Sequence, residues 1–279
     1  MTGTGAGCDA HAHVLDRAVP STVPGAAYPA FDAPGSAFLA HLDALGLAYG
    51  VAVNPSTYGT DHRVLLDALR RYPDRLRGVA VVPADAPDTE LDELHDAGVR
   101  GCRAQDLFPG GVPLTDLSEL ARRLGPRGWH VQVWTDVTDT FELLLRAAKE
   151  ERAALVVDHL GFTPAPEPGE RDAAAPLLRE LLATGNVWVK LSGAYRMAAG
   201  ETETEAARRL LPRVEAVLDA APDRLVWGSD WPYVACPGPR PTDADHAAVL
   251  DTWLPDPALR HRVLVKNPAR LYGLPPADR

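Results

Sequence analysis

The feature that most constrains this chain is a repeated alternation between short β-branched runs and longer segments with helical spacing. Such alternation is typical of βαβ units, in which helices connect the strands of a parallel sheet. We expect the strands to end near His13, Asn54, Pro83, Arg103, Thr135, His159, Gly193 and Asp230. Eight strands and 279 residues match a (β/α)8 barrel, which typically has about 250 residues. The sequence therefore predicts an α/β fold, a (β/α)8 TIM barrel forming a single domain over residues 1–279.

The segments between the expected strands carry apolar residues at spacings of three and four, which gives each one face to pack on a sheet. Helices are expected over residues 36–45, 61–72, 114–124, 140–151, 176–183 and 203–220. Three connections that follow strands are long or rich in proline and glycine: 15–35, 162–172 and 231–242. Because strand-following loops form the active-site face of a barrel, these three are expected to wall the pocket.

Composition argues against several classes of protein. Hydrophobic residues make up 46% of the chain and charged residues 24%, which is enough material for a packed core. The formal net charge of -10 argues against a nucleic-acid partner, because phosphate binding needs clustered Lys and Arg. The three cysteines form no CxxC pair, and no leader or apolar run of about 18 residues is recognised. We therefore expect a cytoplasmic protein without membrane contact.

The strongest chemical signal is a His-x-His pair at the expected end of the first strand. His11 and His13 are alternate residues, so they face the same side of a strand. The pair by itself is as easily explained by chance. His159 and Asp230 support it, because each ends an apolar strand where barrel enzymes place catalytic groups. Singly, His159 could be a core histidine and Asp230 a helix cap, but the four together predict an active site.

Further motifs are spread along nearly the whole chain. They are Asp9-Ala-His-Ala-His13, Pro55-Ser-Thr-Tyr-Gly-Thr-Asp61, Arg70-Arg-Tyr-Pro-Asp-Arg-Leu-Arg-Gly78, Val99-Arg-Gly-Cys-Arg103, Val157-Asp-His-Leu-Gly161, Val189-Lys-Leu-Ser-Gly-Ala-Tyr-Arg196, Trp227-Gly-Ser-Asp-Trp-Pro232 and Asn267-Pro-Ala-Arg-Leu-Tyr-Gly273. As a set they resemble the amidohydrolase superfamily, within it the amidohydrolase-related lactonases that open pyrone dicarboxylates, sugar lactones and muconolactones. The resemblance implies a hydrolase of a small cyclic ester.

The expected chemistry begins with Asp230, which takes a proton from water so that the resulting hydroxide attacks the ring carbonyl. His11, His13 and His159, or a metal ion that they hold, are the groups available to stabilise the charge on the carbonyl oxygen. Asp230 then returns the proton to the leaving alkoxide.

The sequence permits two answers about a metal. Many members of the superfamily carry a carbamylated Lys on strand four or a His on strand five, but residues 100–105 and 130–135 offer no evident ligand pair. A two-metal site is therefore not expected. One divalent ion, Zn²⁺ or Mn²⁺, held by His11, His13, His159 and Asp230 has suitable ligand chemistry. At least one lactonase of the resembled branch works without metal, so the same residues could also act directly.

Several residues near the expected mouth are candidates for binding a substrate. Arg103 ends the fourth strand, and in the resembled family the arginine of this motif holds a substrate carboxylate. Lys190 and Arg196 lie at and just beyond the end of the seventh strand. Ser56 and Tyr58 follow the second strand and can donate neutral hydrogen bonds. Each of these could instead be a solvated or loop residue.

Aromatic side chains that follow strands are expected to shape the pocket or to pack as core and lid: Trp134, Trp231 and Tyr233. The remaining histidines have no evident partners in the sequence and are expected to be structural: His41, His62, His95, His130, His246 and His261.

Two other functions stay open from the sequence. The first is a zinc-dependent decarboxylase of an unsaturated or aromatic acid, because superfamily relatives with this histidine and aspartate set remove carboxylates. The second is a barrel that binds a ligand without catalysis, which the presence of all four central residues disfavours. In every case the expected partner is a small molecule. The sequence names neither the substrate nor the oligomeric state.

Overall fold

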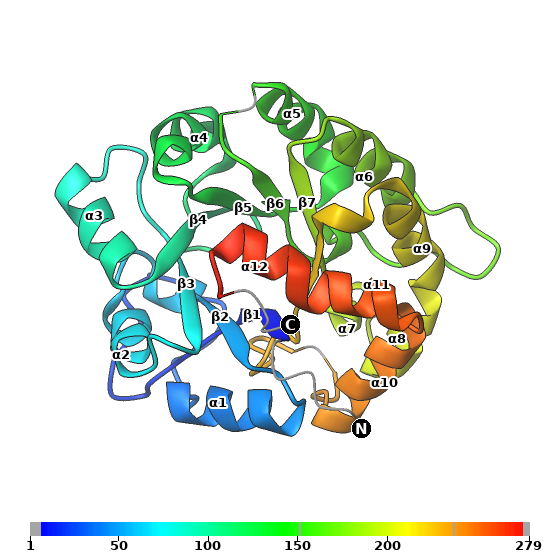
Figure 1. Cartoon of the computed structure of the whole chain (residues 1–279), viewed down its shortest axis with the longest axis horizontal. Coiled ribbons are helices and arrows are strands. Elements are labelled where there is room, and N and C mark those ends of the chain that lie inside the picture. Colours follow the sequence, from blue (N-terminus) through cyan, green and yellow to red (C-terminus); the bar gives the residue numbers. More distant parts are fainter. Residues whose placement is uncertain (1–6, 151, 237, 276–279) are drawn as a thin grey trace.

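The structure, a computed structural model, describes residues 7–150, 152–236 and 238–275. Its eight strands are all parallel and lie in chain order, β1 to β8. The strands are β1 (Cys8–Ala12), β2 (Tyr49–Val53), β3 (Leu76–Ala80), β4 (Val99–Gln105), β5 (His130–Trp134), β6 (Leu155–Val157), β7 (Val187–Leu191) and β8 (Leu225–Trp227). The ring closes just beyond β1 and β8, where His13 N donates to Trp231 O at 2.7 Å and Asp230 N donates to His11 O at 2.8 Å. The predicted TIM barrel is confirmed (Figure 1).

Helices surround the strands. They are α1 (Gly35–Ala44), α2 (Arg63–Arg71), α3 (Asp88–Asp96), α4 (Leu117–Leu124), α5 (Val137–Lys149), α6 (Ala174–Ala183), α7 (Ala194–Met197), α8 (Glu203–Arg209), α9 (Leu211–Ala220), α10 (Asp243–Trp253), α11 (Pro257–His261) and α12 (Asn267–Tyr272). Short helical turns are η1 (Ser56–Tyr58), η2 (Leu114–Asp116), η3 (Gly125–Arg127), η4 (His159–Gly161), η5 (Pro222–Arg224) and the π-helical η6 (Arg262–Lys266). Within the described ranges, no helix has the length and apolar character that crossing a membrane requires.

Two predicted helices are divided in the structure. The helix expected over residues 114–124 is the short turn η2 followed by α4. Residues 203–220 were expected to form a single helix, but α8 ends and α9 begins at Leu210. Pro212 occupies the first turn of α9. Proline has no N–H to donate to the preceding turn and its ring clashes with the carbonyl four residues earlier, so a continuous helix is interrupted there.

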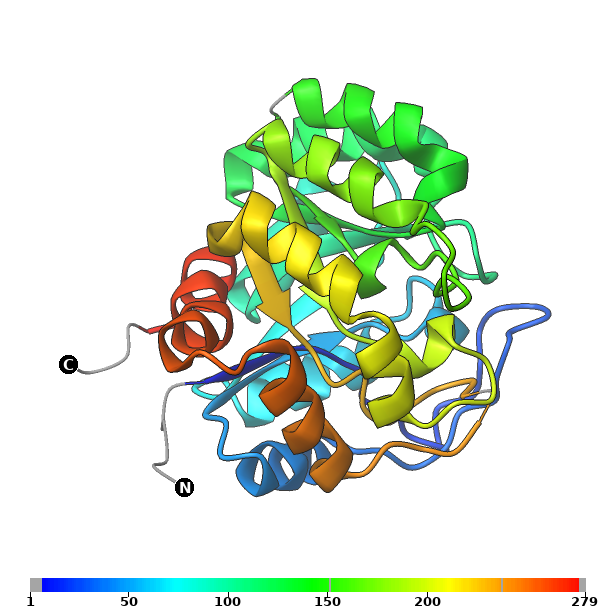
Figure 2. The same cartoon turned by 90° about the vertical axis from the view of Figure 1, so that its right-hand side faces the viewer.

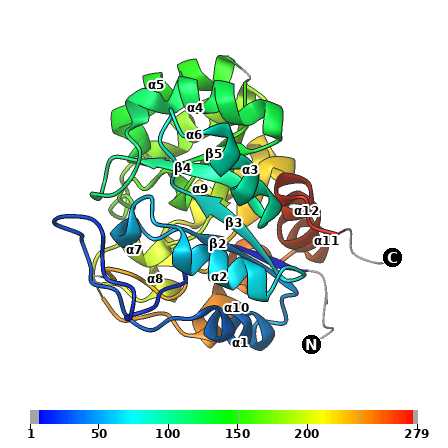
Figure 3. The same ribbon diagram turned by 90° about the vertical axis from the view of Figure 1, so that its left-hand side faces the viewer.

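Alternation along the strands separates two apolar cores. In β2, Val51 and Val53 pack inside the barrel with Tyr272 of α12, whereas Ala52 packs on the outer helices. Helix α12 closes the amino end of the barrel, and the loop of residues 15–35 lies at the opposite end (Figures 2 and 3). The carboxyl end is therefore the face that carries the long connections, as it is in TIM-barrel enzymes.

A buried arginine fixes one of these connections. Arg213 of α9 is fully buried, and its Nε donates to Asp172 Oδ2 at 2.8 Å. Its Nη atoms donate to the backbone oxygens of Thr163 at 2.7 Å and Pro164 at 3.0 Å. One side chain thus anchors the start and the end of the 162–172 loop to the helix layer.

We expect Arg213→Met to lower the free energy of unfolding by about 3 kcal/mol, because the substitution leaves a carboxylate and two carbonyl groups without their buried donor. The matched control is Arg179→Met, which removes an exposed cation from α6. Urea titration of both variants measures the difference. Equal stabilities for the two would mean that Arg213 does not hold the loop.

Candidate active site

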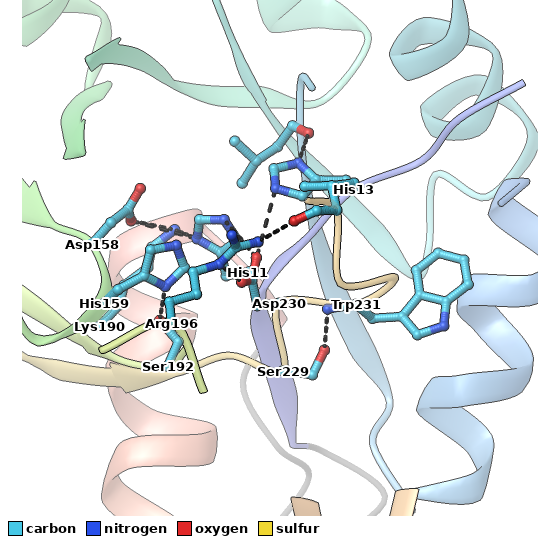
Figure 4. Close-up of polar contacts among 12 residues, drawn as sticks. His11, His13, Asp158, His159, Lys190, Ser192, Arg196, Ser229, Asp230 and Trp231 are labelled. Carbon is cyan, nitrogen blue, oxygen red and sulfur yellow. Dashed lines mark hydrogen bonds and ion pairs between the residues drawn. The ribbon is translucent and has the colours of Figure 1, made fainter. Parts of the chain in front are cut away.

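The residues that the sequence singled out meet at the carboxyl end of the barrel. His11 lies on β1, His159 follows β6, and Asp230 follows β8. One ligand atom of each lies within 4.8 Å of the others. His11 Nε2 and His13 Nε2 are both 3.7 Å from Asp230 Oδ1 (Figure 4). All four side chains are buried, so the structure brings together the proposed catalytic set from three strand ends.

The backbone turns sharply where two of these residues leave their strands. His159 has a φ of 48° and Asp230 a φ of 62°, both in the left-handed region that non-glycine residues rarely adopt. Such conformations cost free energy and cluster at functional sites. Gly193 faces His159, and a Cβ at this glycine would lie 2.7 Å from His159 Nδ1. The position also has a φ of 65°, so a larger residue would displace the imidazole.

The two carboxylate oxygens of Asp230 have different surroundings. Oδ2 accepts hydrogen bonds from Tyr195 Oη at 2.7 Å and from Arg196 Nε at 2.5 Å. Oδ1 is buried and has no hydrogen-bond partner among the described residues. Burial alone would raise the pKa of Asp230, but Arg196 and the imidazoles lower that pKa below its usual range. The carboxylate is therefore ionised at neutral pH, with one oxygen left free.

The histidines around this oxygen are neutral at pH 7. Burial lowers the pKa of His13 to about 3 and that of His159 to about 4, and it also lowers the pKa of His11. His13 Nδ1 lies 2.8 Å from the carbonyl oxygen of Val53, which can only accept. His13 therefore carries its proton on Nδ1 and turns the lone pair of Nε2 toward Asp230. His159 Nδ1 is hydrogen-bonded to Ser192 Oγ at 2.9 Å.

A layer of buried polar side chains supports His11 from inside the barrel. Lys190 Nζ donates to Gln132 Oε1 at 2.5 Å and lies 3.2 Å from His11 Nδ1. Asp158 Oδ1 lies 3.4 Å from the same His11 nitrogen and 3.4 Å from Lys190 Nζ. Burial lowers the pKa of Lys190 to about 8, which still leaves the amine mostly protonated at pH 7. His11 Nδ1 thus lies between a donor, Lys190 Nζ, and an acceptor, Asp158 Oδ1. If Nδ1 accepts from Lys190, Nε2 carries the proton; if Nδ1 donates to Asp158, Nε2 has a lone pair.

A narrow pocket adjoins the cluster. Its wall is formed by His13, Tyr28, Ser56, Arg103, Phe108, Trp134, His159, Arg196, Asp230 and Val234. The Arg103 guanidinium lies over the Trp134 ring, 4.7 Å from its centroid. Ser56, Arg103 and Arg196 are the predicted substrate-binding residues that reach this wall.

Two predicted binding residues lie elsewhere. The Tyr58 hydroxyl donates to Asp16 O at 2.9 Å and accepts from Asp16 N at 3.0 Å, so Tyr58 holds the 15–35 loop. Lys190 belongs to the buried layer beneath His11 and does not face the cavity. Both assignments followed from position at a strand end, which does not tell how far up the barrel a side chain reaches.

Two predicted aromatic residues also face away from the cavity. The indole of Trp231 stacks on Phe38, with ring centroids 5.5 Å apart, and points away from the cluster (Figure 4). The Tyr233 hydroxyl bonds to His246 Nε2 at 2.8 Å. The expectation that the other histidines lack partners was wrong for His246, His62 and His95, which are hydrogen-bonded, and for His41, which pairs with Asp243 at 2.7 Å.

The family model described as Amidohydrolase matches residues 8–274. The chain belongs to the amidohydrolase family. A 2-pyrone-4,6-dicarboxylate hydrolase from Comamonas testosteroni is 32% identical over 274 residues, covering 95% of this chain and 89% of that protein. A 4-sulfomuconolactone hydrolase from Rhizobium radiobacter is 33% identical with the same coverage. A D-galactarolactone isomerase from Agrobacterium fabrum is 30% identical over 242 residues, which are 83% of this chain and 78% of that protein.

Solved structures show the same relationship. A protein from Pseudomonas putida, assigned as a 2-pyrone-4,6-dicarboxylic acid hydrolase, superposes with a TM-score of 0.81 at 32% identity. The alignment covers 96% of this amidohydrolase and 98% of that chain. The resemblance stated from the motifs is thus confirmed over almost the full barrel.

Sequence reasoning missed some residues of this amidohydrolase site. Tyr28 and Phe108 reach the cavity from loops, where no periodic pattern tells the direction of a side chain. Tyr195, which donates to Asp230, could have been found, because it directly precedes Arg196 in a recognised motif. Glu203 gave no signal, since nothing in a helix start distinguishes a buried glutamate from an exposed one.

Glu203 holds the short helix that carries the partners of Asp230. Its Oε2 accepts from the backbone N–H of Tyr195 at 2.8 Å, in the first turn of α7. Burial, together with the charge of Asp230 and other carboxylates, raises the pKa of Glu203 to about 7. A carboxylic acid whose pKa is raised in the folded state stabilises the fold below its unfolded pKa, and this stability is lost as pH rises through the folded pKa.

We therefore expect the stability of Glu203→Gln, relative to the native amidohydrolase, to increase by on the order of 3 kcal/mol between pH 4.5 and pH 8, because the amide does not ionise. Chemical denaturation at several pH values measures the difference. The control, Glu215→Gln on the exposed face of α9, should show no such trend. A flat difference for Glu203→Gln would show that this carboxyl ionises normally.

Proposed function

We propose that this amidohydrolase opens a lactone of a small cyclic substrate by attack of water on the ring carbonyl. The observation that carries the proposal is Asp230 Oδ1, a buried and ionised oxygen with no hydrogen-bond partner among the described residues. It faces the Nε2 atoms of two neutral histidines at 3.7 Å. A water molecule between these groups would have a proton acceptor on one side and polar nitrogens on the other.

The proposed steps use the residues of this chain. Asp230 Oδ1 accepts a proton from water, and the hydroxide forms a bond to the carbonyl carbon. The tetrahedral intermediate collapses by breaking the bond to the ring oxygen. Because Arg196 keeps the pKa of Asp230 low, the carboxyl readily returns its proton to the leaving alkoxide. The product is a hydroxy acid, or its keto tautomer when the ring is a pyrone.

The donor set also fits one divalent metal ion. His11 Nε2 and Asp230 Oδ1 are buried atoms without hydrogen-bond partners in the described part of the chain, and His13 Nε2 presents a lone pair beside them. Two imidazole nitrogens and a carboxylate oxygen are ligands that suit Zn²⁺, and Mn²⁺ also accepts them. We propose that His11, His13, His159 and Asp230 hold such an ion. When bound, it would polarise the carbonyl or lower the pKa of water.

The names of the three curated relatives state or imply a lactone substrate. This supports lactone opening over decarboxylation. A ligand-binding barrel without catalysis would not need a buried carboxylate oxygen that lacks a hydrogen-bond partner among three neutral histidines, because burying such an atom is unfavourable. We propose a small-molecule substrate and no nucleic-acid partner. The cytoplasmic location expected from the cysteines stays a prediction.

We expect Asp230→Asn to lower kcat for lactone opening by about 10²–10⁴, the contribution of a positioned general base. The amide preserves the shape but does not accept the proton. Acid release from a panel of lactones, followed with a pH indicator, measures the rate. Asp219→Asn, on the exposed face of α9, is the control. If folded Asp230→Asn kept half the native rate, Asp230 would not be the base.

Elemental analysis of protein purified without chelator should find close to one equivalent of zinc or manganese. Removal of the ion should abolish turnover, and affinity should weaken as pH falls because ligand protonation competes with the metal. Full activity of metal-free protein would contradict the metal proposal. In that case hydrogen bonds from His11 and His159, in the tautomers that carry a proton on Nε2, would polarise the carbonyl.

A further inference from the structure

Lys190 is a buried cation that the proposed reaction does not use. It lies on β7, its side chain is 0% exposed, and both Lys190 and Asp158 lie beside His11 (Figure 4). Its Nζ donates to Gln132 Oε1 at 2.5 Å and is 3.2 Å from His11 Nδ1. Burying a charge is unfavourable unless other groups pair with it, so the contacts of this amine show what it does.

Two side chains hold the amine of Lys190 in place. Burial lowers the pKa of Lys190 to about 8, and Asp158, with Oδ1 3.4 Å from Nζ, opposes this shift. Gln132 bridges the ion pair, because its Nε2 donates to Asp158 Oδ2 at 2.8 Å while its Oε1 accepts from Nζ. Lys190 therefore reaches His11 as a protonated amine in a fixed position.

The geometry favours Lys190 over Asp158 as the partner of His11 Nδ1. A protonated amine can only donate, so Nδ1 accepts from Nζ. In the competing arrangement Nδ1 would donate to Asp158 Oδ1, which is 3.4 Å away. That oxygen has no hydrogen-bond partner among the described residues. Because burial lowers the pKa of His11 and keeps the ring neutral, its single proton then resides on Nε2.

The Nε2–H group of His11 is left available by the residues around it. Nε2 is buried without a hydrogen-bond partner in the described ranges, and Asp230 Oδ1 lies 3.7 Å from it, beyond hydrogen-bond distance. A fixed donor beside the proposed base can stabilise an oxygen on which negative charge develops. His13 differs, since its proton is on Nδ1 beside Val53 O and its Nε2 has only a lone pair.

We propose that Lys190 is a positioning residue that makes His11 a hydrogen-bond donor to the carbonyl oxygen of the substrate. Lys190 does not line the pocket, so it acts only through its bond to His11 Nδ1. The acceptor, a lactone carbonyl, rests on the proposed function. The position of the proton on His11 does not depend on it.

The same contact affects the metal ion proposed above. Binding an ion through His11 requires a lone pair on Nε2, so the ring proton would have to reside on Nδ1. Asp158 Oδ1, which has no hydrogen-bond partner in the described part of the chain, is the oxygen that would accept that proton. The bond from Lys190 therefore opposes metal binding at His11, and the test below uses protein from which metal has been removed.

The ring nitrogens of His11 test the proposal without a substrate. In chelator-treated protein labelled with ¹⁵N-histidine, two-bond ¹H–¹⁵N spectra distinguish a ring nitrogen that carries a proton from one that has a lone pair. Signals that are lost in His11→Asn identify this residue. We expect a proton on Nε2 and a lone pair on Nδ1, and a proton on Nδ1 would overturn the proposal. Because Lys190 is not substituted, this result stands even if a Lys190 variant is unstable.

The variant Lys190→Met removes the donor and keeps a long apolar side chain. His11 Nδ1 should then donate to Asp158 Oδ1, so that Nε2 loses its proton. For lactone opening, kcat should fall by about tenfold or more while KM changes by less than about threefold, because the donor acts mainly on the developing charge. Lys149→Met, an exposed cation of α5, is the control. An unchanged kcat in a variant whose His11 proton has moved would overturn the proposal.

The two measurements separate this proposal from the proposed function. If the native protein carries the His11 proton on Nε2 but opens no lactone, the proposed reaction fails and the hydrogen bond from Lys190 to His11 stands. If lactones are opened while the proton resides on Nδ1, the proposed reaction stands and the role of Lys190 is overturned.

Discussion

The ion pair between Arg196 and Asp230 is the interaction on which the site depends. It occupies one carboxylate oxygen and leaves the other free, facing two histidines. The side chain of Asp230 is 0% exposed and that of Arg196 only 6%, so the attraction acts with little screening by water. The pair also joins the strand-following segments of β7 and β8. Tyr195 of α7, whose backbone N–H is held by Glu203 at the start of α8, fixes the geometry of the pair. A structural ion pair thereby gives one oxygen its chemical role.

Paired charges also stabilise the buried polar layer beneath His11. Lys190, Asp158 and Gln132 lie inside the barrel because each points inward from or just after its strand, where alternate residues face the axis. A lysine buried without a carboxylate would lose its proton or destabilise the fold. With Asp158 beside it, the amine stays mostly protonated and contacts His11 Nδ1. If His11 Nδ1 donates to Asp158, His11 Nε2 has a lone pair that can bind a metal. If Nδ1 instead accepts from Lys190, Nε2 carries the proton and does not bind one.

The sequence predicted the barrel and the four central residues because both follow from strand periodicity. Apolar runs mark strands, and an ionisable residue that ends such a run lies at the carboxyl face, as His159 and Asp230 do. That rule does not tell how far along the barrel axis a side chain lies, which is why Lys190 was expected near the substrate. The rule does not apply to residues that follow the end of a strand. Asp230 and Tyr233 have positive φ, so the chain turns and the aromatic side chains of the 231–236 turn pack outward.

Long-range contacts place the cavity residues that the sequence did not predict. Tyr28 reaches the cavity because Tyr58 and Asp16 hold its loop, and Phe108 does so by packing on Trp134. Each contact joins residues whose separation in the sequence carries no local pattern. The part of the wall that Tyr28 and Phe108 form therefore became visible only in three dimensions.

The central claim is that Asp230 activates water, which then attacks the carbonyl carbon. A single-turnover reaction in ¹⁸O-labelled water tests it most directly, with mass spectrometry of the product and of the peptide that contains Asp230. The account predicts one labelled oxygen in the new carboxylate, and none in the leaving-group oxygen or in Asp230. Label in Asp230 would show that it is a nucleophile, and an isomerised product without label would show that water does not attack.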